Sequence, residues 1–181
     1  MKFIPSDLTG VVLIEPDVHR DHRGFFLESY TRDKFAGGGV TGDFVQDNHS
    51  CSAAAGVLRG LHFQNPPFAQ SKLVRVTRGA IYDVAVDLRK SSPTFGQWRG
   101  YRLSDENFNL LFVPVGFAHG FCTLVDNTEV QYKVDRPYAP TADTGIRWND
   151  PSVGIEWPVK EPVLSDKDKN LPFLREIVSP F

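Results

Sequence analysis

An arginine, a histidine and a lysine stand close together where the sequence otherwise predicts buried strands. Arg59 and His62 lie in the run Val57–Gln64, and Lys72 opens the next apolar run ten residues after His62. Arginine is a permanent cation, and histidine is the side chain that titrates near neutral pH. Together with a lysine, they indicate a site that holds an anion and moves a proton. The alternative is an ordinary core histidine beside solvated cations at strand ends.

The alternation of side chains along a strand indicates which residues point into the protein. Residues of equal parity share one face of a strand. Lys72 alternates in step with the valines of its own run, and Tyr132 does so in the run Glu129–Val134. Both side chains are therefore predicted on an inner face, where a charge needs a compensating reason. The alternative for Tyr132 is a core tyrosine with a hydrogen-bonded hydroxyl.

Arg59 and His62 have opposite parity, which on a regular strand would separate them. Gly60 lies between them, and a glycine inside a strand often marks a bulge. A bulge of one residue brings the two side chains back to the same face. The sequence therefore predicts a bulge at Gly60.

Length and composition restrict the class of protein. The 181 residues predict one domain, residues 1–181, and the net charge of −2 gives no reason to expect binding to nucleic acid or to a membrane surface. No window approaches the ~20 apolar residues of a membrane span. Two cysteines, Cys51 and Cys122, give neither a disulfide framework nor metal-binding spacing. Because Met1–Ser6 lacks a long apolar core, we expect no signal peptide and a cytoplasmic protein.

The chain predicts an all-β fold, because short apolar runs alternate with turn residues. Short helices are expected at residues 31–36 and 165–170, and no longer segment has a helical period. Many strands with few helices favour a sandwich or barrel, and a jelly roll suits this length. The expected strands are 10–16, 24–30, 44–50, 57–64, 72–78, 80–89, 98–103, 110–114, 119–125 and 129–134.

Other polar residues offer candidate ligands with structural alternatives. Arg23 stands at a turn before an aromatic strand, in which Glu28 is a candidate buried acceptor or a solvated surface residue. The run 46–50 is densely polar and offers amides for a base or sugar, or else a plain strand end. Ser165 and Asp168 have the spacing of a helix capping box, which gives Asp168 a structural role.

A metal site is not expected. The run from Pro114 to His119 resembles half of the metal-binding signature of cupins, but His62-Phe63-Gln64 lacks the second histidine of the other half. Because three nitrogens and a carboxylate are not available together, we predict chemistry by side chains without a metal.

Seven motifs together resemble the dTDP-4-dehydrorhamnose 3,5-epimerase family. They follow in order along nearly the whole chain without large insertions. They are residues 44–50 (FVQDNHS), 59–64 (RGLHFQ), 72–75 (KLVR), 92–98 (SPTFGQW), 116–121 (GFAHGF), 154–158 (GIEWP) and 164–168 (LSDKD).

The resemblance implies a cupin-type jelly roll, a homodimer, no cofactor and a place in dTDP-rhamnose biosynthesis for cell-surface polysaccharide. The implied substrate, dTDP-4-dehydro-6-deoxy-D-glucose, becomes dTDP-4-dehydro-L-rhamnose by inversion at carbons 3 and 5. Such inversion needs a base, an acid on the opposite face and a donor for the enolate oxygen. These roles fall to His62, Tyr132 and Lys72, with Asp168 orienting and charge-stabilising His62 as in a His–Asp dyad.

The resemblance also implies a set of residues that hold the substrate. A diphosphate needs several cations, which this set supplies despite the slightly negative total charge. The set consists of Arg23, Phe26, Glu28, Gln46, Asp47, Asn48, Arg59, Lys72, His119, Tyr138, Asp143 and Lys167.

Some features leave alternatives open. His19, His22 and Asp143 differ from the residues expected in relatives, so we expect different contacts with the nucleotide there but the same reaction. One alternative function is an epimerase that inverts only carbon 3 or only carbon 5. The other is a cupin-type module that binds a nucleotide sugar without chemistry, for which an inward Lys72 and Tyr132 have less use.

Overall fold

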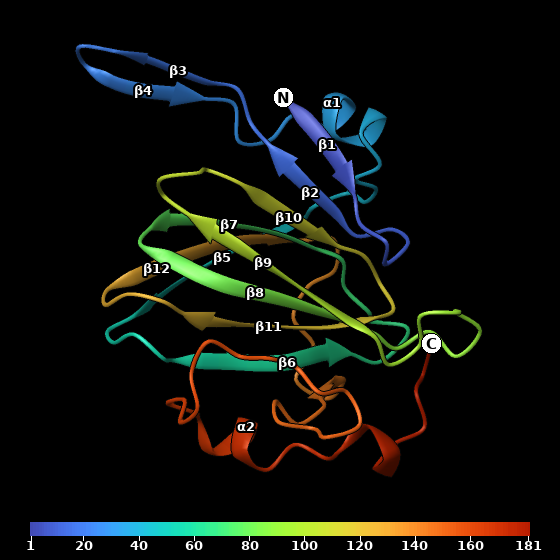
Figure 1. The fold of residues 1–181 in the computed structure, drawn as a ribbon. Coiled ribbons are helices and arrows are strands. Elements are labelled where there is room, and N and C mark those ends of the chain that lie inside the picture. The colour runs from blue at the N-terminus through green and yellow to red at the C-terminus, as the bar shows by residue number, and fades with distance from the viewer.

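The computed structural model describes all 181 residues, and β-strands dominate it (Figure 1). The strands are β1 Lys2–Pro5, β2 Val12–Glu15, β3 Val18–Asp21, β4 Gly24–Leu27, β5 Gln46–Ser52, β6 Leu58–Gln64, β7 Lys72–Arg78, β8 Ala80–Asp87, β9 Trp98–Ser104, β10 Leu110–Val113, β11 Phe117–Thr123, β12 Thr128–Val134 and β13 Asp143–Gly145. The helices are α1 Arg32–Gly37, α2 Asp166–Lys169 and the 3-10 turn η1 Leu174–Glu176.

Two antiparallel sheets form the body of the protein. One has the strand order β1-β2-β10-β7-β12-β5, and the other has the order β13-β6-β11-β8-β9. Strands that are neighbours in a sheet are often distant in sequence, so the chain passes repeatedly from one sheet to the other. This arrangement confirms the predicted all-β jelly roll.

The inner faces of the two sheets meet in an apolar core. Val74 and Val76 of β7 point inward, as the alternation in the sequence predicted. They pack with Ile81 and Ala85 of β8 and with Phe121 of β11. Burial of a valine, isoleucine or phenylalanine side chain stabilises the fold by about 1.5–3 kcal/mol.

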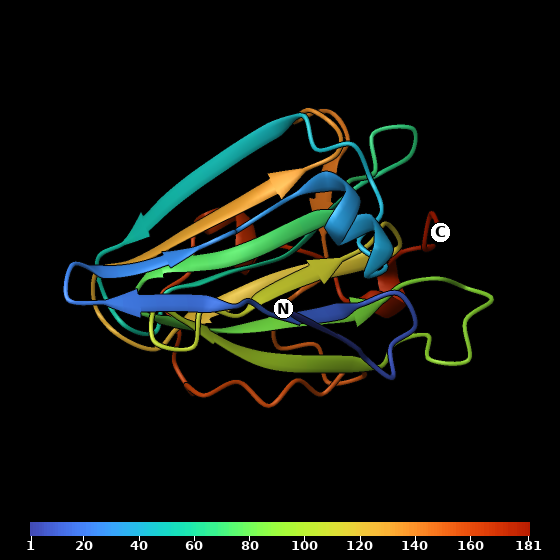
Figure 2. The ribbon, with the colours of Figure 1, turned by 90° about the horizontal axis from the view of Figure 1, so that it is seen from above.

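Further segments cover the outer faces. Phe35 of α1 and Val40 are buried against the outer side of the six-stranded sheet, and Figure 2 shows α1 lying over it. On the other side, Trp157 and Phe181 pack with residues that include Phe63 of β6. The C-terminal part of the chain, which carries α2, therefore lies against β6 (Figure 1).

Strands β3 and β4 form a separate two-stranded hairpin that pairs with neither sheet. It lies at the opposite end of the molecule from α2 (Figure 1). Phe26 is 71% exposed there. The predicted strand 24–30 ends earlier, at Leu27, and Glu28 is not buried but pairs with Lys34 at the surface.

Candidate active site

Strands β6, β7, β11 and β12 and the α2 region surround a cavity of about 440 Å³. A second cavity of about 340 Å³ adjoins it, and His62, Lys72, Tyr132 and Lys167 line both. The polar residues that line the first cavity are Ser50, Arg59, His62, Lys72, His119, Tyr132, Ser165, Lys167 and Asp168. Arg59, Lys72 and Lys167 are basic and Asp168 is the single carboxylate among these residues, so the cavity favours an anion.

His62 and Asp168 form a close side-chain pair in the first cavity. His62 Nε2 lies 2.6 Å from Asp168 Oδ1, and Asp168 is only 2% exposed. Burial raises the pKa of the Asp168 carboxyl, but hydrogen bonds from His62, Ser165 and the Gly60 backbone outweigh it and leave the pKa below its usual value. The carboxylate is therefore charged at neutral pH and orients the imidazole.

Asp168 also takes part in the helix cap predicted from the sequence. Its backbone N–H donates to Ser165 Oγ at 3.1 Å, as an N-cap requires. Its carboxylate does not return to the Ser165 backbone but reaches His62. The backbone of Asp168 therefore takes part in the cap of α2, while its side chain contacts His62.

The predicted bulge at Gly60 is present. Phe121 of β11 pairs with Arg59, while His119, two residues earlier, pairs with His62, three residues later. The extra residue turns Arg59 and His62 toward one cavity. Gly60 has φ +139°, and a Cβ there would lie 2.5 Å from the Gly120 Cα. Only glycine fits this close approach of two backbones.

Lys72 and Tyr132 face the cavity from neighbouring strands of the other sheet. Burial lowers the pKa of the Lys72 ammonium to about 8, against the opposing pull of Asp143 and Asp83. Burial raises the pKa of the Tyr132 phenol above its usual value, although nearby Arg59 opposes this. At neutral pH the cavity therefore holds a charged lysine, which can stabilise an enolate oxygen, and a protonated phenol, which can donate a proton.

A second His–Asp pair lies deeper in the barrel. His119 Nε2 is 2.7 Å from Asp83 Oδ1, and Asp83 is completely buried. The other carboxylate oxygen, Oδ2, has no hydrogen-bond partner. Sequence reasoning missed Asp83. The available signal was a single acidic residue inside the apolar run 80–86, at the inward parity.

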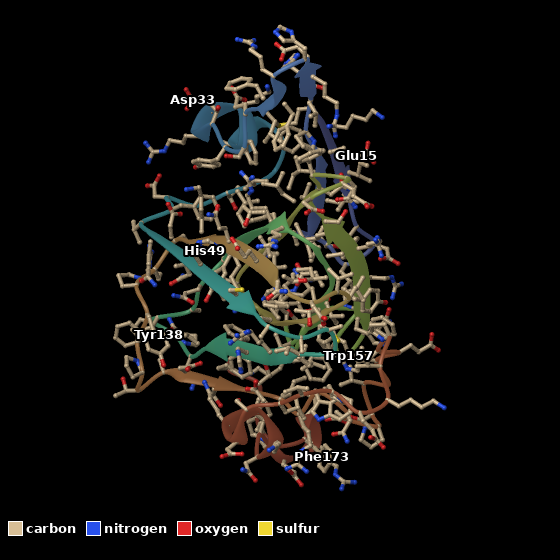
Figure 3. All side chains as sticks on the ribbon, turned by 90° about the vertical axis from the view of Figure 1, so that its left-hand side faces the viewer. Glu15, Asp33, His49, Tyr138, Trp157 and Phe173 are labelled. Carbon is tan, nitrogen blue, oxygen red and sulfur yellow. The ribbon has the colours of Figure 1, made fainter.

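The adjoining cavity brings together the residues predicted for the outer part of the substrate. Asp143 Oδ2 accepts hydrogen bonds from Tyr138 Oη and Lys167 Nζ. Gln46 and Asn48 line the same cavity, and the Tyr138 backbone N–H donates to Gln46 Oε1 at 3.1 Å. Figure 3 shows Tyr138 at the edge of the molecule, where a planar ring is accessible to a ligand.

Four other predicted residues lie outside the two cavities. Asp47 is on the outer face of β5 and pairs with Lys133 at 2.8 Å. Arg23, Phe26 and Glu28 are on or next to the β3–β4 hairpin, where Arg23 pairs with Asp21. Within one chain, these four side chains do not join the site.

No helix in the structure is long and apolar enough to cross a membrane. The structure also holds no cluster of three or more His, Cys, Asp or Glu residues that suits a metal ion.

The fold and the site define a jelly-roll enzyme equipped for acid–base chemistry on an anionic substrate. A family model described as dTDP-4-dehydrorhamnose 3,5-epimerase matches residues 5–176. The enzyme of that name from Shigella flexneri is 53% identical over 171 residues, which cover 94% of each chain. The chain belongs to the dTDP-4-dehydrorhamnose 3,5-epimerase family and is an isomerase, as the resemblance in the sequence predicted.

Solved structures agree with this assignment. The crystal structure of the Bacillus anthracis 3,5-epimerase with TDP and PPi bound has a TM-score of 0.93 and 58% identity, covering 96% of this chain and 99% of that one. The Legionella pneumophila enzyme in complex with dTDP-4-keto-L-rhamnose has a TM-score of 0.92 and 44% identity, covering 97% and 94%.

Proposed function

We propose that the cavity around His62 binds dTDP-4-dehydro-6-deoxy-D-glucose and inverts carbons 3 and 5 to give dTDP-4-dehydro-L-rhamnose. The observation that carries this proposal is the hydrogen-bonded His62–Asp168 pair, which shares one cavity with Tyr132 and Lys72. A base, an acid and a cation therefore line the same cavity.

The proposed mechanism uses the ketone at carbon 4, which acidifies the hydrogens on carbons 3 and 5. His62 removes a proton from one face, and Asp168 stabilises the imidazolium that forms. The Lys72 ammonium stabilises the developing enolate oxygen, aided by Arg59. Tyr132 then returns a proton to the opposite face of the carbon, which inverts it.

Binding of the nucleotide diphosphate would orient the small sugar. Arg59, Lys72 and Lys167 supply charge around the cavities, and the aromatic ring of Tyr138 offers a surface for the base. Binding energy at the nucleotide can then position the reacting carbons, which lie apart from it.

The test is incubation with the substrate in heavy water, without added metal, followed by NMR of the sugar. We expect deuterium at carbons 3 and 5 and an L-rhamno product that a reductase can trap. The variant His62→Ala should lose turnover but retain nucleotide binding. Exchange at only one carbon would select the single-site epimerase, and binding without exchange would select the non-catalytic module.

We further propose a homodimer in which the β3–β4 hairpin of one chain completes the site of its partner. The hairpin pairs with neither sheet of its own chain, and Phe26 is largely exposed. Arg23 and Glu28, which the family resemblance assigns to the nucleotide, are in the turn of this hairpin and directly after it. The hairpin lies at the opposite end of the molecule from α2 (Figure 1). A second chain would give these side chains a ligand to contact.

Mixing two inactive variants tests this arrangement. A heterodimer of Arg23→Ala with His62→Ala would contain one site with His62 and the partner's Arg23 intact. After subunit exchange we expect activity to return to about a quarter of wild type, since half of the dimers are mixed and each has one complete site. No recovery despite proven exchange would mean that Arg23 does not act across the dimer. Cytoplasmic residence stays a prediction that cell fractionation can test.

A further inference from the structure

Asp83 is a buried charge that the fold alone does not explain. It lies on β8 inside the barrel, where His119 stands between it and the substrate cavity. One carboxylate oxygen accepts a hydrogen bond from His119 Nε2, while the other is enclosed without a partner. A buried polar group without a hydrogen bond costs free energy, so its presence needs an explanation.

Asp87 shows what a structural carboxylate on this strand looks like. It lies four residues further along β8 and is also completely buried. Its oxygens accept hydrogen bonds from Arg89, Ser92 and Thr94, which organise the loop that follows. Asp87 is therefore fully satisfied by local partners, whereas Asp83 reaches only His119.

The charge of Asp83 also acts on Lys72. Lys72 forms no ion pair within 4 Å, and burial lowers the pKa of its ammonium to about 8. The carboxylates of Asp143 and Asp83 oppose this lowering, but Asp143 is already paired with Lys167. The other charged or titratable groups of the same cavity, from β6, β11, β12 and α2, are Arg59, His62, His119, Tyr132 and Asp168.

We propose that Asp83 is a positioning residue of this epimerase, an inference that rests on the proposed role of Lys72. Its carboxylate holds the imidazole of His119 in the cavity wall and supplies the countercharge that keeps Lys72 an ammonium ion. The need for this charge is greatest when the substrate excludes water from the barrel, because charges interact more strongly at low dielectric. Asp83 itself does not touch the substrate.

The first experiment compares Asp83→Asn with the control Asp87→Asn by an NMR titration of Lys72. Both changes remove a buried carboxylate from β8 and preserve the shape of the side chain. The carbon-13 signal of Lys72 Cε, assigned with Lys72→Met, reports the pKa of the ammonium directly. We expect Asp83→Asn to lower this pKa by about one unit and Asp87→Asn to leave it unchanged. Equal titration of Lys72 in wild type and Asp83→Asn would overturn the proposal.

The second experiment measures kcat and KM against pH for the same variants. With Asp83→Asn, we expect the alkaline loss of kcat to begin at lower pH. The deficit would be about tenfold at pH 9 and smaller at pH 6, as the protonated fraction of Lys72 falls. KM should change by less than about twofold, because Asp83 lies behind His119. A variant that melts early but keeps the wild-type pH profile would assign Asp83 a structural role only.

Two further arms keep the outcomes separate. Asp83→Ser leaves room for a water molecule and carries the same expectations, so it replaces Asp83→Asn if that variant does not fold. A wild-type protein that exchanges no deuterium would refute the proposed reaction. The Lys72 titration requires no catalysis and would then still decide whether Asp83 supplies the countercharge.

Discussion

The variant Asp168→Asn separates the proposed catalytic role of this residue from its structural role. The amide keeps the backbone N–H that donates to Ser165 Oγ, so the cap of α2 remains. It also keeps an acceptor for His62 Nε2 but removes the negative charge 2.6 Å away. The perturbation therefore acts on the imidazolium that forms during proton transfer and leaves the fold of α2 intact.

The expected loss of rate follows from the strength of a hydrogen bond to a charged group. A bond to a charged group is worth about 1.5–3 kcal/mol, and each 1.36 kcal/mol is tenfold in rate, so kcat should fall about 10- to 150-fold. The carboxylate is buried and its pKa is held below the usual value, so little of its effect is screened by solvent. Binding of dTDP should not change.

The assay is deuterium incorporation from heavy water at carbons 3 and 5, with circular dichroism as the measure of folding. The matched control is Asp166→Asn on the same helix, where an exposed carboxylate pairs only with Lys169. We expect the control to retain full activity. A folded Asp168→Asn protein with wild-type exchange would refute the dyad, and one that merely unfolds would leave Asp168 with a structural role.

Four further results are expected. Tyr132→Phe should retain initial exchange at one carbon while product formation falls; equal loss of both would argue against Tyr132 as the acid. Gly60→Ala should lower the free energy of unfolding in urea by about 1–3 kcal/mol or more, because its Cβ would overpack against the Gly120 backbone. Exhaustive chelation should leave full activity, and recovery only with added metal would contradict the mechanism. Burial raises the pKa of the Asp87 carboxyl, but hydrogen bonds from Arg89, Ser92 and Thr94 outweigh it and lower the pKa from 3.8 to about 2. The ionised carboxylate should therefore add about 2 kcal/mol to the free energy of unfolding above pH 4. Unfolding measured against pH should show this contribution disappear as the pH falls through about 2.

The alternation of side chains along each strand predicted which residues face the cavity. Alternation alone placed Lys72 and Tyr132 inward, and a glycine between Arg59 and His62 predicted the bulge that brings them together. These predictions succeed because they rest on residues within one strand. The same rule separates Asp47 from Gln46 and Asn48, so the outward position of Asp47 was also available from the sequence.

Contacts between distant segments were beyond the reach of sequence patterns. Asp83 meets His119 across a strand register that no local signal fixes. Strands β1, β3 and β13 were not predicted, because each is only three or four residues long and depends on its pairing partner. The family resemblance named Arg23 and Glu28, but a list of residues does not say which chain supplies them.

The register of the sheets explains why the proposed catalytic residues, which come from different parts of the sequence, meet at one end of the barrel. Because β7 and β12 are antiparallel, Lys72 at the start of one strand lies opposite Val134 at the end of the other. Tyr132, two residues earlier on β12, therefore comes to the same end, while Val76 and Val130 pair with each other further along. One face of each strand thus carries apolar residues in the core and polar residues in the cavity. Substitutions of the core residues on that face should lower stability, whereas substitutions two to four residues away, in the cavity, should lower activity.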